Sequence, residues 1–227
     1  MSFNDTVMES SGIDQGLRSY FNDIFLRMTF ALVLSAVTAY IGSTVPALYA
    51  GGILTWLIIL SPLAVVLVMS FGAERLSNNA LILCFVAFAG LNGLAMGSLL
   101  LAYTGTSVVS AFFLAAAVFA TFAILGYTTK RDLTSMGSFL LVGLIGIIIA
   151  SLVNIWLALP ALAATINVLS VLIFVGLTAY DVQMLKNTYS EGGDSGKTRT
   201  LGALSLYLDF INIFINLLQL LGVKKDD

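Results

Sequence analysis

Long apolar runs dominate the chain, and short polar breaks separate them. A helix that crosses a bilayer needs about 20 apolar residues, and seven runs approach or exceed that length. The runs are continuous and do not alternate with a period of two, which favours helices and excludes a transmembrane β-barrel. We therefore expect an all-α membrane protein with seven membrane-spanning helices over residues 26–47, 53–72, 80–102, 108–128, 136–158, 161–183 and 202–222.

The organisation of the chain follows from these runs. Residues 1–25 form a polar N-terminal segment, residues 26–222 the seven-helix transmembrane domain, and residues 223–227 a short C-terminal tail. The first segment lacks the basic stretch, apolar core and small-residue cleavage site of a secretory signal, so we expect it to be retained and exposed to solvent. The breaks between the runs are too short for a separate soluble domain.

Lysine and arginine are distributed unevenly among the predicted loops. They occur in loops 72–79, 129–135 and 184–201 and are absent from loops 48–52, 103–107 and 159–160. The positive-inside rule therefore predicts a cytoplasmic N-terminus and places the basic loops on the same side. Seven crossings put the C-terminus outside. Lys224 and Lys225 favour the cytoplasm instead, and this leaves a re-entrant last segment as the alternative.

Composition agrees with a membrane protein and narrows its chemistry. The chain is 59% hydrophobic and 10% charged, whereas soluble proteins are about half apolar and a quarter charged. A net charge of −2 gives no basic field for nucleic acid. The absence of histidine removes the commonest metal ligand and general base, and the one cysteine, Cys84, lies in an apolar run. We expect no tightly bound cofactor.

Two aspartates lie within the predicted membrane segments. Ionisable groups at that depth are costly and usually face a bundle interior or a water-filled cavity. Asp181 lies near the cytoplasmic end of the sixth segment, and Asp209 lies about seven residues, roughly 10 Å, into the seventh from the same side. If the two helices are neighbours, the carboxyl groups meet, share a proton and titrate as a coupled unit. Alternatively, each aspartate bonds separately to a serine, an asparagine or the backbone.

A polar stripe runs along the seventh segment. Its members are spaced by four, three, four and three residues, which places them on one helical face while leucine, isoleucine and phenylalanine occupy the rest. Such a face is costly in lipid, so we expect a central helix whose stripe lines a conduit or bonds to surrounding helices. The stripe consists of Ser205, Asp209, Asn212, Asn216 and Gln219.

Arg75 stands at the cytoplasmic end of the second segment, next to Glu74. Its guanidinium would hold a closed state if it reached the aspartates through a charge-assisted bond. The other interpretation is an ordinary topology marker, because positive residues are common at cytoplasmic helix ends.

Residues 205–218, SLYLDFINIFINLL, strongly resemble the closing signature of the Bax inhibitor-like family, also called transmembrane Bax inhibitor motif proteins. The resemblance continues through Tyr180-Asp181, the turn at residues 130–134 and Asn92-Gly93-Leu94. It covers most of the chain after residue 70 and is typical of a bacterial member, which implies a bacterial inner-membrane location. One departure is Asn92, which stands where the family has an acidic residue, so no cation site is carried over there.

The resemblance implies a bundle of six helices around a seventh. It also implies a calcium leak channel whose opening depends on pH through paired aspartates, which match Asp181 and Asp209 and would bind Ca²⁺ transiently. A family arginine that latches onto the pair matches Arg75. Bacterial relatives interact with a membrane-bound AAA protease, which the resemblance suggests as a partner besides lipid, Ca²⁺ and protons.

Two other functions remain open. An intramembrane aspartyl protease also has Tyr-Asp on one helix and a second aspartate on the next, with a shared proton. That family has Gly-x-Gly-Asp at the second aspartate, where this chain has Leu206-Tyr207-Leu208-Asp209. A non-conducting regulator of a membrane-bound protease would use the aspartates only to stabilise the bundle.

Overall fold

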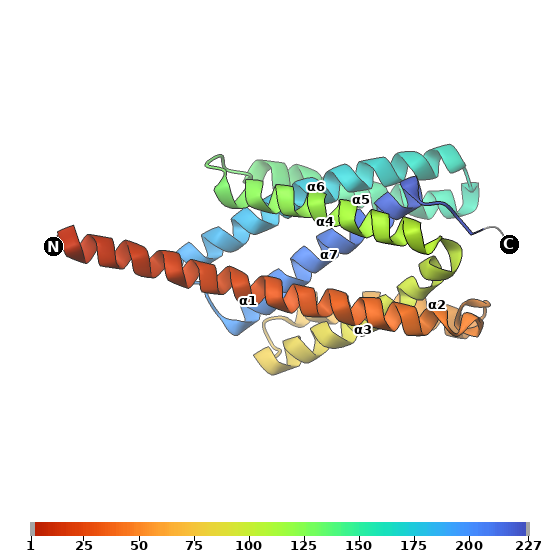
Figure 1. Ribbon diagram of the computed structural model, residues 1–227, viewed down its shortest axis with the longest axis horizontal. Helices are drawn as coiled ribbons and strands as arrows, with labels where there is room; N and C mark the ends of the chain where they lie inside the picture. Colours follow the sequence, from red (N-terminus) through yellow and green to blue (C-terminus); the bar gives the residue numbers. More distant parts are fainter. Residues whose placement is uncertain (1–2, 226–227) are drawn as a thin grey trace.

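The computed structural model describes residues 3–225, with side chains from residue 15 onward, and contains seven long helices (Figure 1). A short 3-10 turn, η1 (Pro46–Tyr49), follows the first of them. All seven are long and apolar enough to cross a membrane, which confirms the predicted all-α class and helix count. The helices are α1 (Phe3–Ser43), α2 (Ile53–Gly72), α3 (Asn78–Ala102), α4 (Gly105–Thr128), α5 (Thr134–Leu157), α6 (Pro160–Ser190) and α7 (Gly196–Leu221).

The first helix differs most from its predicted range. α1 begins at Phe3 and passes residue 25 without a break, whereas the apolar run begins at residue 26. Side chains before that point already belong to the core, at the three- and four-residue spacing of one helical face. The polar residues between them hide this face from a search for continuous apolar runs. The buried residues are Leu17, Tyr20, Phe21 and Ile24.

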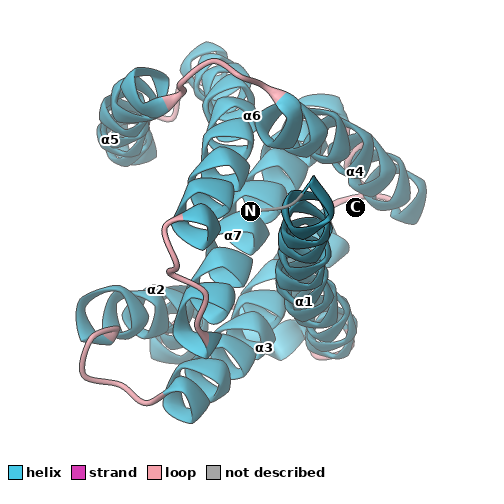
Figure 2. Cartoon of the chain, turned by 90° about the vertical axis from the view of Figure 1, so that its left-hand side faces the viewer, coloured by secondary structure: helices cyan, strands magenta, loops and turns pink. Residues whose placement is uncertain are grey.

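The last helix lies deepest in the bundle. α7 packs against α1, α3, α4 and α6, and it lies among them in the view along the bundle (Figure 2). α2 packs mainly on α3, and α5 packs on α6 at the periphery. The expectation that all six other helices surround the seventh is therefore not confirmed in full, because α2 and α5 cover their neighbours rather than α7.

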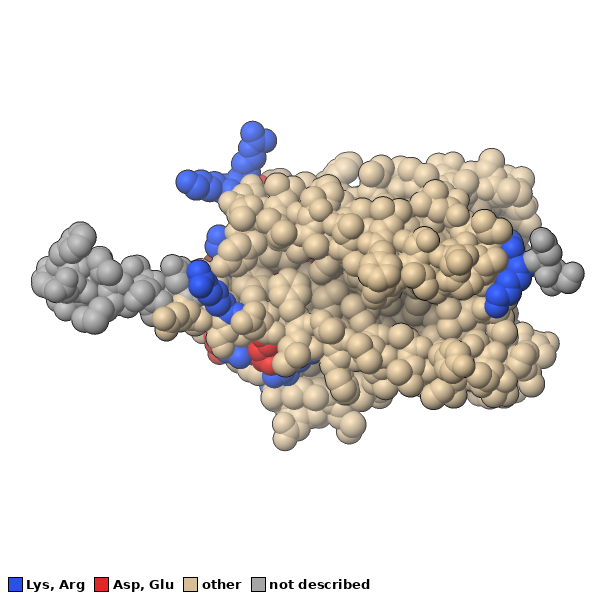
Figure 3. Space-filling view, viewed as in Figure 1, with Lys and Arg blue, Asp and Glu red and all other residues tan. Residues whose placement is uncertain are grey.

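The two ends of the bundle differ in charge. Lysines and arginines gather at the end from which α1 enters, and a smaller basic patch lies at the opposite end (Figure 3). Lys224 and Lys225 belong to that opposite end, since they contact Tyr103 and Leu100. We call these two ends the basic end and the tail end. The termini of the described chain lie at opposite ends (Figure 1), as expected when a seventh helix crosses fully. A re-entrant last segment would have returned the tail to the basic end.

The tail is fastened to the turn between α3 and α4. Tyr103 and Lys224 form an isolated antiparallel bridge, and the Lys225 N–H donates to the Ala102 carbonyl at 3.0 Å. These bonds satisfy backbone groups that the helix ends leave without intrahelical partners. The end of α7 is therefore held in register against α3 and α4.

Candidate functional site

Asp181 and Ser205 meet across the interface between α6 and α7. The Ser205 hydroxyl donates a hydrogen bond to Oδ2 of Asp181. The two helices run antiparallel, because the short loop Glu191–Ser195 joins them at the basic end. The first predicted aspartate is thus half-buried and bonded to the first residue of the predicted stripe.

Asp209 lies one turn farther along α7 and is almost completely buried, at 3% exposure. Thr178 of α6 lies beside its carboxyl group, but the Thr178 hydroxyl donates to the Phe174 carbonyl of its own helix at 2.8 Å. Among the described residues, Oδ2 of Asp209 has no hydrogen-bond partner. A buried polar atom without a partner costs free energy, so its retention calls for an explanation.

The two aspartates lie diagonally across one helix interface. Thr178 precedes Asp181 by three residues, and Asp209 follows Ser205 by four, so each carboxyl faces a hydroxyl-bearing residue one turn from the other. The charge of Asp181 acts on the Asp209 carboxyl. Within the described part of the chain no hydrogen bond joins the two carboxyl groups directly. The interface therefore holds two interacting acids, of which the deeper one has a free acceptor atom.

A groove leads from the basic end to this interface. It measures about 240 Å³ and borders Asp181 and Ser205 at one extremity and the loop-side residues Thr188 and Thr198 at the other. Asp209 is not among its lining residues and lies beyond the inner end. Water or an ion at the basic end can therefore approach Asp181 first. The lining residues are Asp181, Met184, Leu185, Thr188, Thr198, Leu201, Gly202 and Ser205.

A close approach of α4 supports the aspartates from behind. Gly126 of α4 lies directly against the backbone of Ala179, which stands between Thr178 and Asp181 on α6. A β-carbon at Gly126 would overlap the Ala179 carbonyl. Glycine thus lets α4 and α6 pack at backbone contact, and this packing fixes the position of the α6 segment that carries the first aspartate.

A network of ion pairs joins α1, α7 and the α6–α7 loop at the basic end. Arg199 of α7 makes two hydrogen bonds of 2.7 Å to Asp194 and reaches Asp23 of α1 at 3.3 Å. Arg27 pairs with Asp23 at 2.9 Å and donates to Thr200 at 2.8 Å. The Arg199 hydrogen bonds lower the pKa of Asp194, which lies in the loop outside the membrane segments. Sequence reasoning missed this network, although Asp23 and Arg27 show the i,i+4 spacing of a helical ion pair.

A second polar network lies in the middle of the bundle. The fully buried Tyr207 of α7 shares a 2.7 Å hydrogen bond with Ser35 of α1. Asn92 of α3 donates to the same hydroxyl at 2.9 Å. The Ser35 hydroxyl also lies 2.8 Å from the Ala89 carbonyl of α3. Asn92, the departure from the family signature, thus bonds to tyrosine. Isolated polar residues in apolar runs were the only sequence signal for this network.

Arg75 lies in the turn after α2, with its side chain exposed. It makes no ion pair with Asp181 or Asp209 among the contacts of the described residues. The same turn is tied to α7 by Lys197, whose ammonium donates to the carbonyls of Ala73 and Glu74 at 3.3 and 3.1 Å. A latch by Arg75 therefore stays a prediction about a different arrangement of this turn.

The predicted stripe divides into two parts. Ser205 and Asp209 face α6, as described. Farther along, Asn212 donates to the Leu208 carbonyl at 2.8 Å and Asn216 donates to the Asn212 carbonyl at 2.7 Å, both within α7. Gln219 is exposed near the tail end. The asparagine amides therefore bond to their own helix rather than to a neighbour.

The aspartate interface offers few ligands for a metal ion. No group of three or more acidic, histidine or cysteine side chains comes together in the part of the chain that the structure describes. Ca²⁺ takes six to eight oxygen ligands, and the aspartate interface offers two carboxyl groups and the nearby hydroxyls of Ser205 and Thr178. The interface therefore provides only part of a calcium coordination shell.

Comparisons with known proteins extend over nearly the whole chain. A family profile described as "Inhibitor of apoptosis-promoting Bax1" matches residues 17–226. An uncharacterized protein of Rickettsia prowazekii is 37% identical, with 97% of this chain and 96% of the relative covered. The inner membrane protein YbhL of Escherichia coli is 38% identical over 92% of this chain and 94% of its own length. An uncharacterized membrane protein of Streptococcus pyogenes is 36% identical over 96% and 98%.

Proposed function

The chain belongs to the Bax inhibitor-like family of multi-pass membrane proteins, and from that membership we propose that it is a pH-sensitive calcium leak channel gated by Asp181 and Asp209. The proposal places it in a bacterial inner membrane, as the name of the E. coli relative suggests. The basic end would face the cytoplasm by the positive-inside rule. Lipid, protons and Ca²⁺ are the partners that this function needs.

One observation supports the proposal above the others. The deeper carboxyl, that of Asp209, is buried with an unpartnered oxygen, and it interacts with a second carboxyl that borders a groove. An inert structural aspartate would be expected to have its oxygens bonded. A free acceptor at membrane depth is instead suited to receive a proton or a cation.

Proton occupancy would set the charge of the site. Two interacting carboxyl groups in a water-poor interface do not both ionise cheaply, so they titrate as a unit. When the unit loses its proton, the negative charge attracts Ca²⁺ from the groove. The incomplete oxygen shell favours passage over retention, because a resident Ca²⁺ would need more ligands.

The tail half of α7 would form the closed barrier in this proposal. Beyond Asp209 the helix buries mainly apolar side chains, and its asparagine amides bond to the helix itself. A cation leaving the aspartates would meet no continuous set of oxygens there. Opening would therefore require α7 to shift so that Asn212 and Asn216 face the route. Arg75, exposed in the described arrangement, would act as a latch in another one.

Calcium flux into proteoliposomes tests this function. Purified full-length protein would be reconstituted with an internal calcium indicator, and influx would be measured between about pH 6 and pH 8. A single shared proton predicts a response of up to ~tenfold per pH unit. We expect Asp209→Asn to flatten this pH response. Glu191→Gln, which removes a carboxylate from the exposed loop, should keep it.

Two results would overturn the proposal. One is an unchanged pH response in Asp209→Asn protein that melts like the wild type. The other is a wild-type protein that carries no flux at any pH, which would favour the non-conducting regulator. Cleavage of a model transmembrane substrate, abolished by the same substitution, would favour the aspartyl protease instead.

A further inference from the structure

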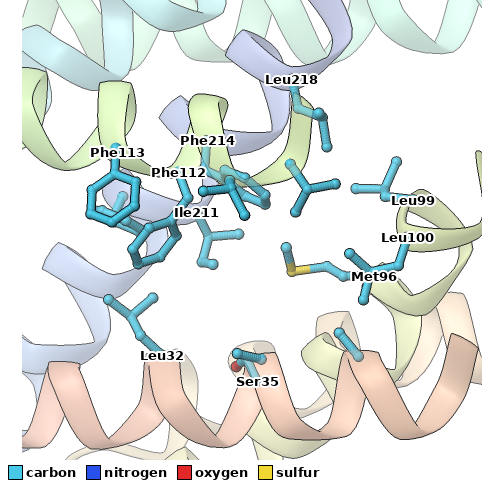
Figure 4. Close-up of a pocket in the computed structure, with 15 residues that line it drawn as sticks. Leu32, Ser35, Met96, Leu99, Leu100, Phe112, Phe113, Ile211, Phe214 and Leu218 are labelled. Carbon is cyan, nitrogen blue, oxygen red and sulfur yellow. The ribbon is translucent and has the colours of Figure 1, made fainter. Parts of the chain in front are cut away.

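An elongated apolar cavity lies on the other side of α7 from the aspartates. Its volume is about 300 Å³, and side chains of α1, α3, α4 and α7 surround it (Figure 4). Ser35 is the single polar residue in its lining, and the Ser35 hydroxyl is already bonded to Tyr207. The cavity has no role in the proposed gating by Asp181 and Asp209.

The cavity opens sideways, between α1 and α4. These two helices flank it without packing closely on each other, while α3 and α7 form its floor. Lining residues at the mouth are exposed, including Ala36 of α1 and Val109 and Phe113 of α4. The surface is hollowed between the two helices in Figure 3. Because both helices cross the membrane, the opening faces the hydrocarbon of the bilayer rather than water.

The long dimension of the cavity follows the helix axes. Its lining on α7 extends from Phe210 to Leu218, which corresponds to about 12 Å of helical rise. On α1 it extends from Leu32 to Ala39. A narrow apolar slot that runs along the membrane normal matches the shape and direction of a lipid acyl chain.

Positive charge stands at one end of this slot. The Lys225 ammonium donates to the carbonyl of Leu100 at 2.8 Å, and Leu100 lines the cavity. Lys224 is exposed beside it and pairs with Tyr103 through the backbone. These are the two lysines at the tail end of the bundle (Figure 3). A lipid whose chain fills the slot would place its phosphate at the level of these ammonium groups.

We propose that the slot between α1 and α4 binds one anionic phospholipid, with an acyl chain in the cavity and its phosphate at Lys224 and Lys225. A slot left empty would forfeit dispersion contacts along its walls, so a chain from the bilayer fills it. The lysines add selectivity for a negative headgroup. Asp226 and Asp227 follow them in the sequence, lie outside the described residues, and enter the test below.

Native mass spectrometry of the purified full chain tests the proposal. The protein in detergent would receive equal amounts of phosphatidylglycerol and phosphatidylcholine with the same acyl chains. We expect one retained lipid, mainly phosphatidylglycerol. Ala36→Trp fills the mouth of the slot and should abolish retention. Val37→Trp adds the same side chain to the exposed neighbouring position, which does not line the slot, and should retain the lipid.

Charge variants test the headgroup site separately. Lys224→Gln with Lys225→Gln should reduce the preference for phosphatidylglycerol by about fivefold per lysine. Lys130→Gln with Arg131→Gln removes two charges at the basic end and should leave the preference unchanged. Asp226→Asn with Asp227→Asn should strengthen it.

Three outcomes would overturn the assignment. The first is equal lipid retention by Ala36→Trp and Val37→Trp. The second is a wild type without preference between the two headgroups, or a preference that survives loss of both lysines. The third is a wild-type protein that retains no lipid and forms a dimer that Ala36→Trp disrupts, which would assign the slot to a second copy of the chain. None of these outcomes depends on whether the protein conducts calcium.

Discussion

The polar side chains in the two halves of α7 have different hydrogen-bond partners. In the half toward the basic end, the polar side chains interact with other elements: Ser205 bonds to α6 and Tyr207 bonds to α1 and α3. In the half toward the tail end, Asn212 and Asn216 bond to the α7 backbone. The polar side chains of the first half thus specify which helices are its neighbours, whereas the asparagines of the second half do not, and the backbone bonds of the tail hold that end of α7 instead.

This difference shows that polar residues on one helical face do not by themselves form a continuous route for an ion. The spacing of the stripe places its members on one side of α7. Periodicity alone does not say whether a side chain bonds across an interface or along its own helix. A bond across an interface holds two helices together, and a bond within one helix does not. The following substitutions test this division between the halves.

The largest effect is expected at the close approach that supports the basic-end half. Gly126→Val would drive a side chain into the Ala179 backbone, and overpacking of this kind lowers the free energy of unfolding by about 1–3 kcal/mol. Unfolding of the purified protein in detergent measures the loss. Gly146→Val is the matched control in α5, since a β-carbon there meets no atom within 4 Å. Equal losses in both variants would contradict the role assigned to Gly126.

A smaller effect is expected from polar groups within α7 itself. Tyr207→Phe leaves the partly buried Asn92 amide without its tyrosine partner, while Ser35 keeps its bond to the Ala89 carbonyl, so the free energy of unfolding should fall by about 1 kcal/mol. Asn216→Leu removes only a bond within the helix, so the free energy of unfolding should stay within about 0.5 kcal/mol of wild type or rise. If both variants lose the same stability, the two halves of α7 do not differ as described.

The smallest effect is expected at the outer edge of the basic-end half. Arg199 lowers the pKa of Asp194 by hydrogen bonding, so the pair stabilises the folded state when the carboxyl is ionised. That stability is present above the ordinary carboxyl pKa and is lost as the pH falls through the lowered folded value. Asp194→Asn should therefore cost less than about 1 kcal/mol near pH 7.

The difference between Asp194→Asn and wild type should shrink below about pH 4. Melting curves across this range measure it, with Glu191→Gln in the same loop as the control for an exposed carboxylate. A difference that grows toward low pH would show that the ion pair is not the cause.

The membrane architecture could be predicted from the sequence because it depends on run length. Apolar runs identify helices regardless of their partners, and the ranges predicted for α2, α3, α4 and α5 closely match the observed helices, while α6 ends later and α7 begins earlier than predicted. The start of α1 could not be predicted in this way, because Arg18 and Asp23 interrupt the sequence of apolar residues before residue 26, although the buried residues there share one helical face. In the described chain, α2 and α5 do not pack on α7. This arrangement depends on how side chains of different helices fit together, which the length of an apolar run does not predict.

The sequence predicted which aspartates form the candidate site, but it did not predict the contacts that these residues make. The cost of charge in lipid singled out Asp181 and Asp209, and the α6–α7 loop makes their helices neighbours. The groove and the contact between Gly126 and Ala179 arise from three helices at once. The ion pairs of Arg27 and Arg199 were not predicted, because charged residues near a helix end are usually interpreted as topology markers. Only their partners reveal a specific role.

The depth of α7 has a consequence for how the protein is made. α7 emerges from the ribosome after the other six helices, and it is the least apolar of the seven and the most buried. Its insertion carries Asp209 into the membrane, which is costly for a helix that enters lipid alone. The six earlier helices must therefore keep their inner faces accessible until α7 arrives. The helix that fills the interior of the bundle is thus the last to be inserted. A chain truncated before α7 lacks the surface on which α1, α3, α4 and α6 pack.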